Sequence, residues 1–236
     1  MNQTDYIEFA KNKLDAQFND IGLLITAFTH RSYLNEHRKT VSEHNERLEF
    51  LGDAVLELVV TSYLYNNYPD PEGILTNWRS ALVRTESISD AATRIEMESL
   101  LRLSRGEKRG SERARAQILA NCYEAVIGAL YLDQGYEKVA EFIKKSLLVT
   151  FKDILKSGSW MDPKSSLQEI VQSKEGLTPV YRVIEETGPD HDKIFTVGVF
   201  IGDRLAGTGN GPSKQIGQVA AAASAMKKYA SKGDDV

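Results

Sequence analysis

The stretch HNERLEFLGDAVLEL, from His44 to Leu58, decides the fold of this chain because it sets acidic side chains at helical spacing among apolar ones. At about 100° per residue, Glu46, Glu49 and Asp53 fall within roughly 60° of one another and share one face of a helix. The leucine and valine residues between them form an apolar stripe that would pack against other elements. Carboxylates this close repel one another unless a cation lies between them, and hard oxygen ligands suit Mg²⁺ or Mn²⁺.

The same spacing has a second interpretation, a solvated acidic helix face with Arg47 as an ion-pair partner. The full string ERLEFLGDAVLEL favours the metal site, because it resembles the signature of the ribonuclease III family, the endonucleases that cut double-stranded RNA. In that family Glu46 would correspond to an acid with an outer, substrate-contacting role. The alternative of zinc hydrolysis has little support in a chain with four histidines and one cysteine.

Composition is compatible with this resemblance but names no function. The chain has 236 residues, 42% of them hydrophobic and 26% charged, which allows one or two domains with a proper core. The single cysteine, Cys122, excludes an intrachain disulfide, fits a reducing cytoplasm and is expected to be a small buried residue. No apolar run approaches the length of a membrane span, and residues 1–17 lack a signal-peptide core. The sequence predicts a cytoplasmic protein with no membrane partner.

The net charge of −4 does not favour a nucleic-acid partner, but the local charge distribution does. The segment RLSRGEKRGSERAR, residues 102–115, holds six basic and two acidic residues. Beside an acidic metal site, a basic strip would neutralise the phosphate backbone of a nucleic acid. Arg113 and Arg115 are the preferred phosphate contacts, because guanidinium groups bond phosphate oxygens bidentately. A solvated charged loop is the alternative interpretation.

Hydrophobic periodicity divides the chain into two parts. The first, residues 1–156, is predicted to be an all-α endonuclease domain with helices at 6–14, 21–29, 46–65, 78–94, 118–131 and 136–155. Turn-forming residues interrupt the pattern at 69–73, 106–111 and 134–135. Residues 157–162 have the composition of a short polar linker.

The second part, residues 163–231, is predicted to be a small α+β domain of order αβββα, followed by a tail at 232–236. Its elements are a helix at 163–174, strands at 180–186, 194–201 and 204–211, and a helix at 213–229. This order, with SSLQE near its start and GTGNGPSKQIGQVAAAAS at its end, resembles a double-stranded RNA-binding domain. The resemblance implies recognition of A-form shape through Gln168, Glu169, His191 and Lys214.

A second acidic block, ILANCYEAVIGALYLDQGY at residues 118–136, resembles another conserved block of ribonuclease III. The family has an aspartate and a glutamate three residues apart, whereas this chain has Asn121 and Glu124. The implied metal ligands are Glu49, Asp53, Asn121 and Glu124, with Asp53 and Glu124 catalytic. An amide adds no charge, so the site holds three charges rather than four and metal affinity should fall. The sequence leaves open a variant that still cuts, an inactivating change, and a lineage that binds without cutting.

Other residues match the family less centrally. Glu72, in the PDPEG turn, corresponds to a further acid near the metal site, and Phe50 is a candidate dimer contact or else a core residue. His30 and Ser32 also match a family block, although a lone histidine there is more often a packing or helix-end residue than a catalyst.

The resemblance implies a homodimer that hydrolyses double-stranded RNA with Mg²⁺ or Mn²⁺, leaves 5′-phosphate and 3′-hydroxyl ends, and acts in rRNA and mRNA processing. A catalytically impaired double-stranded RNA-binding protein is the alternative. A helical phosphohydrolase of small molecules is a weaker one, because it leaves the αβββα domain without a role.

Overall fold

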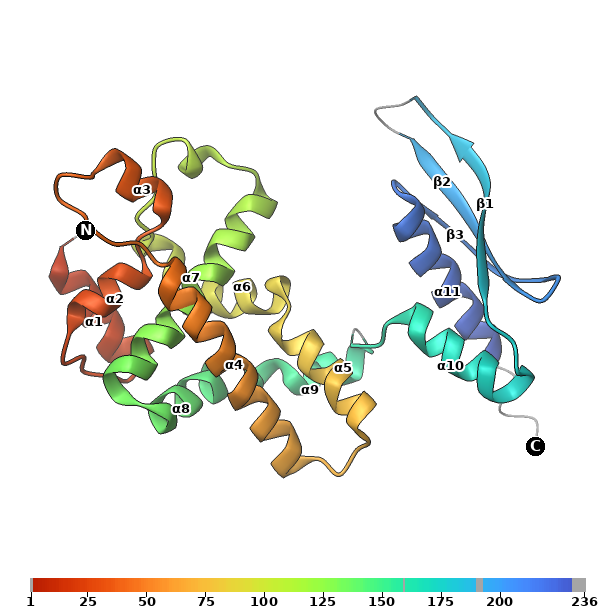
Figure 1. The fold of residues 1–236 in the computed structure, drawn as a ribbon, viewed down its shortest axis with the longest axis horizontal. Helices are drawn as coiled ribbons and strands as arrows, with labels where there is room; N and C mark the ends of the chain where they lie inside the picture. The colour runs from red at the N-terminus through yellow and green to blue at the C-terminus, as the bar shows by residue number, and fades with distance from the viewer. Residues whose placement is uncertain (1, 159, 190–192, 231–236) are drawn as a thin grey trace. The chain divides into compact units, whose positions relative to one another are not determined.

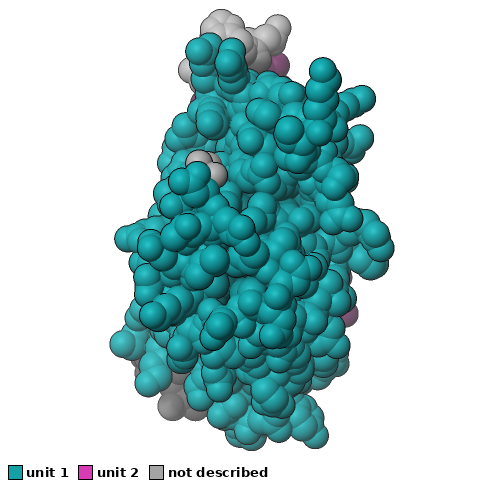
Figure 2. Space-filling view, turned by 90° about the vertical axis from the view of Figure 1, so that its left-hand side faces the viewer, with its two compact units in different colours: residues 1–160 teal, residues 161–236 magenta. Residues whose placement is uncertain are grey.

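The computed structural model describes residues 2–158, 160–189 and 193–230. The chain divides into two compact units, Met1–Trp160 and Met161–Val236, which Figure 2 shows in different colours. This division lies within the stretch 157–162 that the sequence predicts as a linker. Each unit is described by itself below, as the first unit and the second unit.

The regular elements in the described residues of the first unit are helical, as predicted, and Figure 1 shows its longest helices, α4 and α7, crossing each other. Its α-helices are α1 (Gln3–Lys13), α2 (Ile21–Ala27), α3 (Arg31–Glu36), α4 (Glu46–Asn67), α5 (Glu72–Val83), α6 (Thr85–Arg94), α7 (Glu112–Gln134), α8 (Tyr136–Ser146) and α9 (Phe151–Ser157). Short 3-10 turns lie at η1 (Met97–Leu100), η2 (Glu107–Arg109) and η3 (Leu148–Thr150).

The prediction of a single helix at 78–94 is wrong, because the structure has two helices there that meet at Arg84. The backbone of Arg84 is extended, with φ −69° and ψ 152°, so it ends α5 and caps α6. Helix α5 also begins earlier than predicted, directly after Pro71, a residue whose fixed φ is compatible with a helix start. Glu72, predicted in a turn, is therefore the first residue of a helix.

The end of the basic segment is helical, although the sequence predicts a helix only from residue 118. Ser111 accepts a hydrogen bond from the Ala114 N–H at 3.3 Å, and this N-cap starts α7 at Glu112, six residues earlier than predicted. Arg113 and Arg115 consequently lie in the first turns of a helix. The helix predicted at 136–155 is likewise interrupted after Ser146, and the short α3 was not predicted.

Helices α4 and α7 cross so closely that only glycine fits at the crossing. A Cβ atom on Gly52 would overlap the backbone carbonyl of Glu124 and lie 2.9 Å from the nitrogen of Gly128. A Cβ atom on Gly128 would overlap the carbonyl of Leu48. Buried leucine, isoleucine, valine and alanine side chains surround this crossing. Cys122 is fully buried there, as predicted, and burial raises the pKa of its thiol.

The second unit has the predicted αβββα order. Its elements are α10 (Pro163–Glu175), β1 (Val180–Thr187), β2 (Ile194–Ile201), β3 (Arg204–Gly211) and α11 (Lys214–Ala230), with the strands forming an antiparallel sheet in the order β1-β2-β3. Both helices contribute to the same core as the sheet, which contains Leu167, Val199 and Ala222. A Cβ atom on Gly207 would lie 2.6 Å from the carbonyl oxygen of Ala221, so α11 packs directly on the backbone of β3.

The glycine crossing yields a stability prediction. Gly52→Ala should lower the free energy of unfolding of the first unit by roughly 3 kcal/mol, because the new methyl group must displace the α7 backbone. Urea denaturation measures the change. Gly73→Ala is the matched control, since Gly73 also lies in a helix but has nothing within 4 Å of its added Cβ. Equal stability of the two variants would contradict the close crossing.

Candidate active site

The glycine crossing brings acidic residues of two helices together. On α4, Glu49 and Asp53 lie on either side of Gly52 in the sequence, and on α7 the carbonyl of Glu124 faces Gly52 directly. The carboxylates of these three acids are close enough to influence one another electrostatically. Asn121 lies close enough to the Glu49 carboxyl to lower its pKa, so the structure brings all four predicted ligands into one group.

Burial and mutual repulsion oppose ionisation of this group. Burial, followed by the charges of Asp53 and Glu49, raises the pKa of Glu124 from an ordinary value of 4.5 to about 7. The pKa of Glu49 is raised by its burial and by the charge of Glu46, whereas the nearby Asn121 side chain opposes the shift. A divalent cation would remove these repulsions, because it interacts favourably with every ionised carboxylate.

The donor set fits a hard divalent cation. Glu49, Asp53 and Glu124 supply carboxylate oxygens, which such ions prefer. In the part of the chain that the structure describes, no three histidine, cysteine, aspartate or glutamate side chains are placed so that they could hold a metal ion as they stand. Asp53 is exposed while Glu49 and Glu124 are half-buried, so the group is open to solvent on one side. Side-chain rotation would be needed to close it around an ion.

Asn121 is held by a residue that the sequence interpretation missed. Gln117 Nε2 donates a hydrogen bond to Asn121 Oδ1 at 2.7 Å. A carboxylate can only accept hydrogen bonds, so the Asn121 amide group directed at Glu49 is its N–H₂. In this orientation the Asn121 oxygen is turned to Gln117. Glutamine and asparagine four residues apart on a helix are known to pair, and this spacing could have revealed Gln117.

Two outer acids occupy different places. Glu46 lies next to the group, 3.5 Å from Arg31 and 3.8 Å from His44, and its charge acts on Glu49. Glu72 instead lines a different hollow, together with the α4 residues Thr61, Leu64 and Tyr65. Since Thr61 lies roughly 18 Å along α4 from Glu49, the single chain does not bring Glu72 to the carboxylate group.

His30 and Ser32 have structural contacts. The Ser32 N–H bonds to His30 Nδ1 at 3.2 Å and caps α3, and Ser32 Oγ accepts a hydrogen bond from the Ser104 N–H at 3.1 Å. Arg102 is also directed inward, where it donates to Thr29 Oγ1 at 3.1 Å. These contacts attach the basic segment to the α2–α3 region and confirm that His30 is a helix-end residue.

The basic segment presents fewer available cations than its sequence suggests. Arg115 donates to the Lys108 carbonyl at 2.9 Å and lies 3.6 Å from Glu98, so it is engaged within the chain. Arg113 is exposed, as are Arg105 and Arg109. The phosphate contact predicted at Arg113 therefore remains accessible, whereas Arg115 would have to leave its present partners.

The second unit carries its predicted recognition residues on exposed positions. Gln168 and Glu169 lie exposed on α10, and Lys214 is the first residue of α11. Lys214 Nζ lies 3.6 Å from Glu186 and 5.6 Å from the centre of the Phe195 ring. His191 lies outside the described residues.

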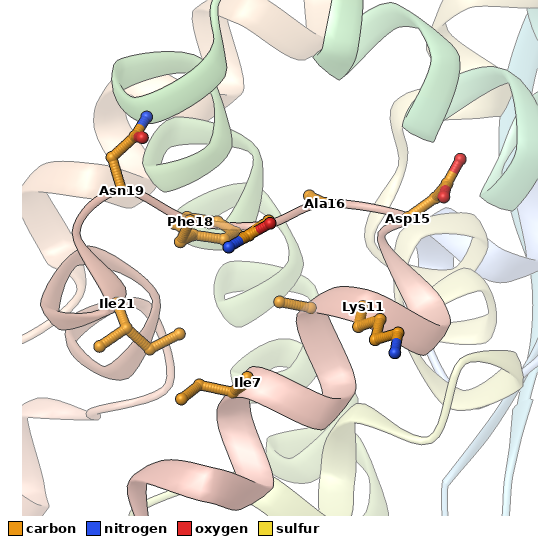
Figure 3. Close-up of a pocket in the computed structure, with 9 residues that line it drawn as sticks. Ile7, Lys11, Asp15, Ala16, Phe18, Asn19 and Ile21 are labelled. Carbon is orange, nitrogen blue, oxygen red and sulfur yellow. The ribbon is translucent and has the colours of Figure 1, made fainter.

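Another hollow of the first unit offers no comparable chemistry. The hollow in Figure 3, of about 590 Å³, is lined by Ile7, Lys11 and Phe18 among others. Its only acidic lining residue, Asp15, forms ion pairs with Lys138 and Lys145. None of the grouped carboxylates lines it, so the active-site candidate remains the α4–α7 group.

A helical unit with carboxylates on two crossing helices, followed by an αβββα unit, defines a nuclease that acts on double-stranded RNA. Residues 20–151 match the family model described as Ribonuclease-III-like, and residues 163–229 match the double-stranded RNA binding motif. The chain belongs to the ribonuclease III family.

Known relatives agree with this assignment. The protein named Ribonuclease 3 from Latilactobacillus sakei is 44% identical to this chain, and the match covers 90% of this chain and 92% of that protein. The protein of the same name from Pelotomaculum thermopropionicum is 43% identical, over 95% of this chain and 93% of that protein. A solved nuclease domain of ribonuclease III from Campylobacter jejuni is similar with a TM-score of 0.53 and 37% identity, over 59% of this chain and 97% of that one. The chain is thus a member of a divalent-metal-dependent endoribonuclease family.

None of the described helices is long and apolar enough to span a membrane.

The raised pKa of Glu124 leads to a prediction about stability. A folded-state pKa above the ordinary value means that stability is lost as pH rises from about 4.5 to about 7. Glu124→Gln should therefore raise the free energy of unfolding at pH 8 by roughly 1–2 kcal/mol, but hardly at all at pH 4.5. Urea denaturation in EDTA at both pH values measures this. Glu112→Gln, an exposed glutamate on the same helix, is the control, and a pH-independent gain for Glu124→Gln would refute the explanation.

Proposed function

We propose that this chain hydrolyses phosphodiester bonds of double-stranded RNA with Mg²⁺ held by Glu49, Asp53 and Glu124. The observation that carries the proposal is the meeting of these carboxylates at the α4–α7 crossing, where the charge of Asp53 opposes ionisation of Glu49 and the charges of both oppose ionisation of Glu124. Mg²⁺ suits carboxylate ligands, and Mn²⁺ should substitute for it. The products would have 5′-phosphate and 3′-hydroxyl ends, and the activity would serve rRNA and mRNA processing in the cytoplasm.

The chain's own residues would position and neutralise the substrate. When bound, a divalent cation supplies an activated water nucleophile and stabilises the leaving oxygen. Glu49 and Glu124, half-buried on packed helices, would hold that cation in a fixed place. Because the pKa of Glu124 is about 7, its carboxyl must lose a proton near neutral pH before it can act as a ligand. Exposed arginines such as Arg105 and Arg113 would neutralise RNA phosphates.

A Glu124→Gln variant tests the catalytic proposal. It should reduce Mg²⁺-dependent cleavage of a long RNA duplex by at least about 100-fold, because a metal ligand loses its charge. Metal-free duplex binding should remain within a factor of two or so of the parent chain. Glu112→Gln is the control and should cut normally. Full cleavage by a folded Glu124→Gln chain would remove Glu124 from the catalytic group.

Asn121 supports a second candidate function, a double-stranded RNA-binding protein with impaired catalysis. The amide adds no charge, and its oxygen is turned to Gln117. If the chain is a weakened enzyme, Asn121→Asp should lower the Mg²⁺ concentration needed for half-maximal cleavage several-fold. Mn²⁺, which accepts neutral ligands more readily, should partly restore the parent chain.

Metal titrations of cleavage by both chains decide between the candidates. Identical Mg²⁺ dependence would show that position 121 contributes no ligand. An absence of cleavage by both chains, in Mg²⁺ and in Mn²⁺, would establish the binding-only function.

We also propose a homodimer formed through the exposed side of α4. Phe50 is 82% exposed, so it does not belong to the core of the single chain. Leu58 and Tyr65, also exposed, lie within about 80° of it around the helix. A hollow of about 790 Å³ lined by Leu23, Leu51 and other residues lies beside Phe50. In a two-fold dimer, each Phe50 could enter the hollow of the partner.

Phe50→Asp should convert the dimer to a monomer, because the interface would have to bury a charge. Sedimentation velocity measures the change in mass. Val149→Asp provides the control, since Val149 is also exposed, at 58%, but lies in η3. A Phe50→Asp chain that sediments as a dimer would exclude this interface.

The second unit is proposed to bind the RNA duplex by shape, through Gln168, Glu169, His191 and Lys214. A-form RNA exposes 2′-hydroxyls and phosphates across a shallow minor groove, and exposed polar side chains can reach them. From Trp160 onward the chain holds nine basic and ten acidic residues, so this unit by itself should bind weakly and with strong sensitivity to salt.

A further inference from the structure

Several lysines of the second unit form contacts with other residues of the same unit. Glu186, near the end of β1, lies between two of them: its Oε1 is 3.6 Å from Lys214 Nζ and its Oε2 is 3.6 Å from Lys193 Nζ. A third lysine, Lys164, donates to Gln218 at 2.8 Å and lies over the Tyr181 ring. In a unit whose acids outnumber its bases, the placement of each acid decides which cations remain available for phosphate.

Among the described acids of the second unit, Glu186 stands out because it contacts two lysines from different segments of the chain. Lys214 begins α11 and Lys193 directly precedes β2. The side chains of Glu186, Lys193 and Lys214 are 40%, 34% and 60% exposed, so the ion pairs lie at the surface, where RNA phosphates could replace the carboxylate. The neighbouring acid, Glu185, lies in the same strand and is also exposed, but successive strand residues point to opposite faces.

We propose that Glu186 competes with RNA phosphate for Lys214 and Lys193 and thereby limits the affinity of the second unit for double-stranded RNA. The inference rests on the proposed duplex binding by this unit and assigns to Glu186 an affinity-setting role within it. For Lys214 to bind a phosphate, its ion pair with Glu186 must open. The free energy lost when this ion pair opens reduces the free energy gained from the phosphate contact. The carboxylate left behind would also face the polyanion and repel it.

The size of the effect follows from the strength of exposed ion pairs. Each exposed ion pair contributes little free energy. Removing the charge of Glu186 should therefore tighten duplex binding roughly 2- to 10-fold at low salt. Each lysine that becomes available for phosphate releases counterions on binding. The plot of log K against log salt concentration should therefore become steeper, by up to about one for each released lysine.

The experiment measures binding of the whole chain to an RNA duplex in EDTA, over a range of KCl concentrations, for the parent chain, Glu186→Gln and Glu185→Gln. Both variants change net charge equally and lie in the same strand, so they separate the ion pairs from the overall charge. We expect Glu186→Gln to bind more tightly than Glu185→Gln and to show the steeper salt dependence. Thermal unfolding of each variant verifies the fold.

A double-mutant comparison tests the route of the effect. In a Lys214→Gln background, Glu186→Gln should tighten binding less than in the parent chain, because the lysine that Glu186 pairs with at the start of α11 is absent. Equal binding by Glu186→Gln and Glu185→Gln, weaker binding by Glu186→Gln, or an unchanged gain in the Lys214→Gln background would each overturn the proposal. If the parent chain does not bind duplex RNA, the proposed function itself fails, and Glu186 has no such role.

Discussion

The close crossing of α4 and α7 at Gly52 and Gly128 is the contact on which the first unit depends. The helices approach until the backbone of one meets the other, which only hydrogen side chains permit. The same approach brings Glu49 and Asp53 to Glu124, because these acids lie within one turn of the crossing. Core packing and the geometry of the candidate active site are therefore one constraint, and a change that separates the helices would alter both.

This arrangement makes the carboxylate group at the crossing a source of instability. Half-buried carboxylates that repel one another favour protonation, and the pKa of Glu124 near 7 expresses that cost. A bound cation would offset it, so folding and metal binding support each other. Asn121 reduces the cost, because its neutral amide lowers the pKa of Glu49, whereas another carboxylate would raise it. A lower charge in the metal-free protein implies a weaker attraction for the metal.

Nucleic-acid recognition in this chain depends on which cations are available rather than on how many there are. In the first unit Arg102 and Arg115 are engaged with the chain itself, while Arg113 remains exposed. In the second unit Glu186 engages Lys214. The net charge of −4 is thus compatible with duplex binding, since a few exposed cations at suitable positions are sufficient for phosphate contacts.

Local pattern by itself determined the strands 194–201 and 204–211, the helical nature of the first unit and the shared face of Glu49 and Asp53, because period and turn residues act over a few positions. Family resemblance, rather than periodicity, associated these acids with Glu124. Only the tertiary structure decided the break at Arg84 and the inward direction of Arg102. The direction of Arg102 depends on its hydrogen bond with Thr29, a residue far away in the sequence that no local window contains.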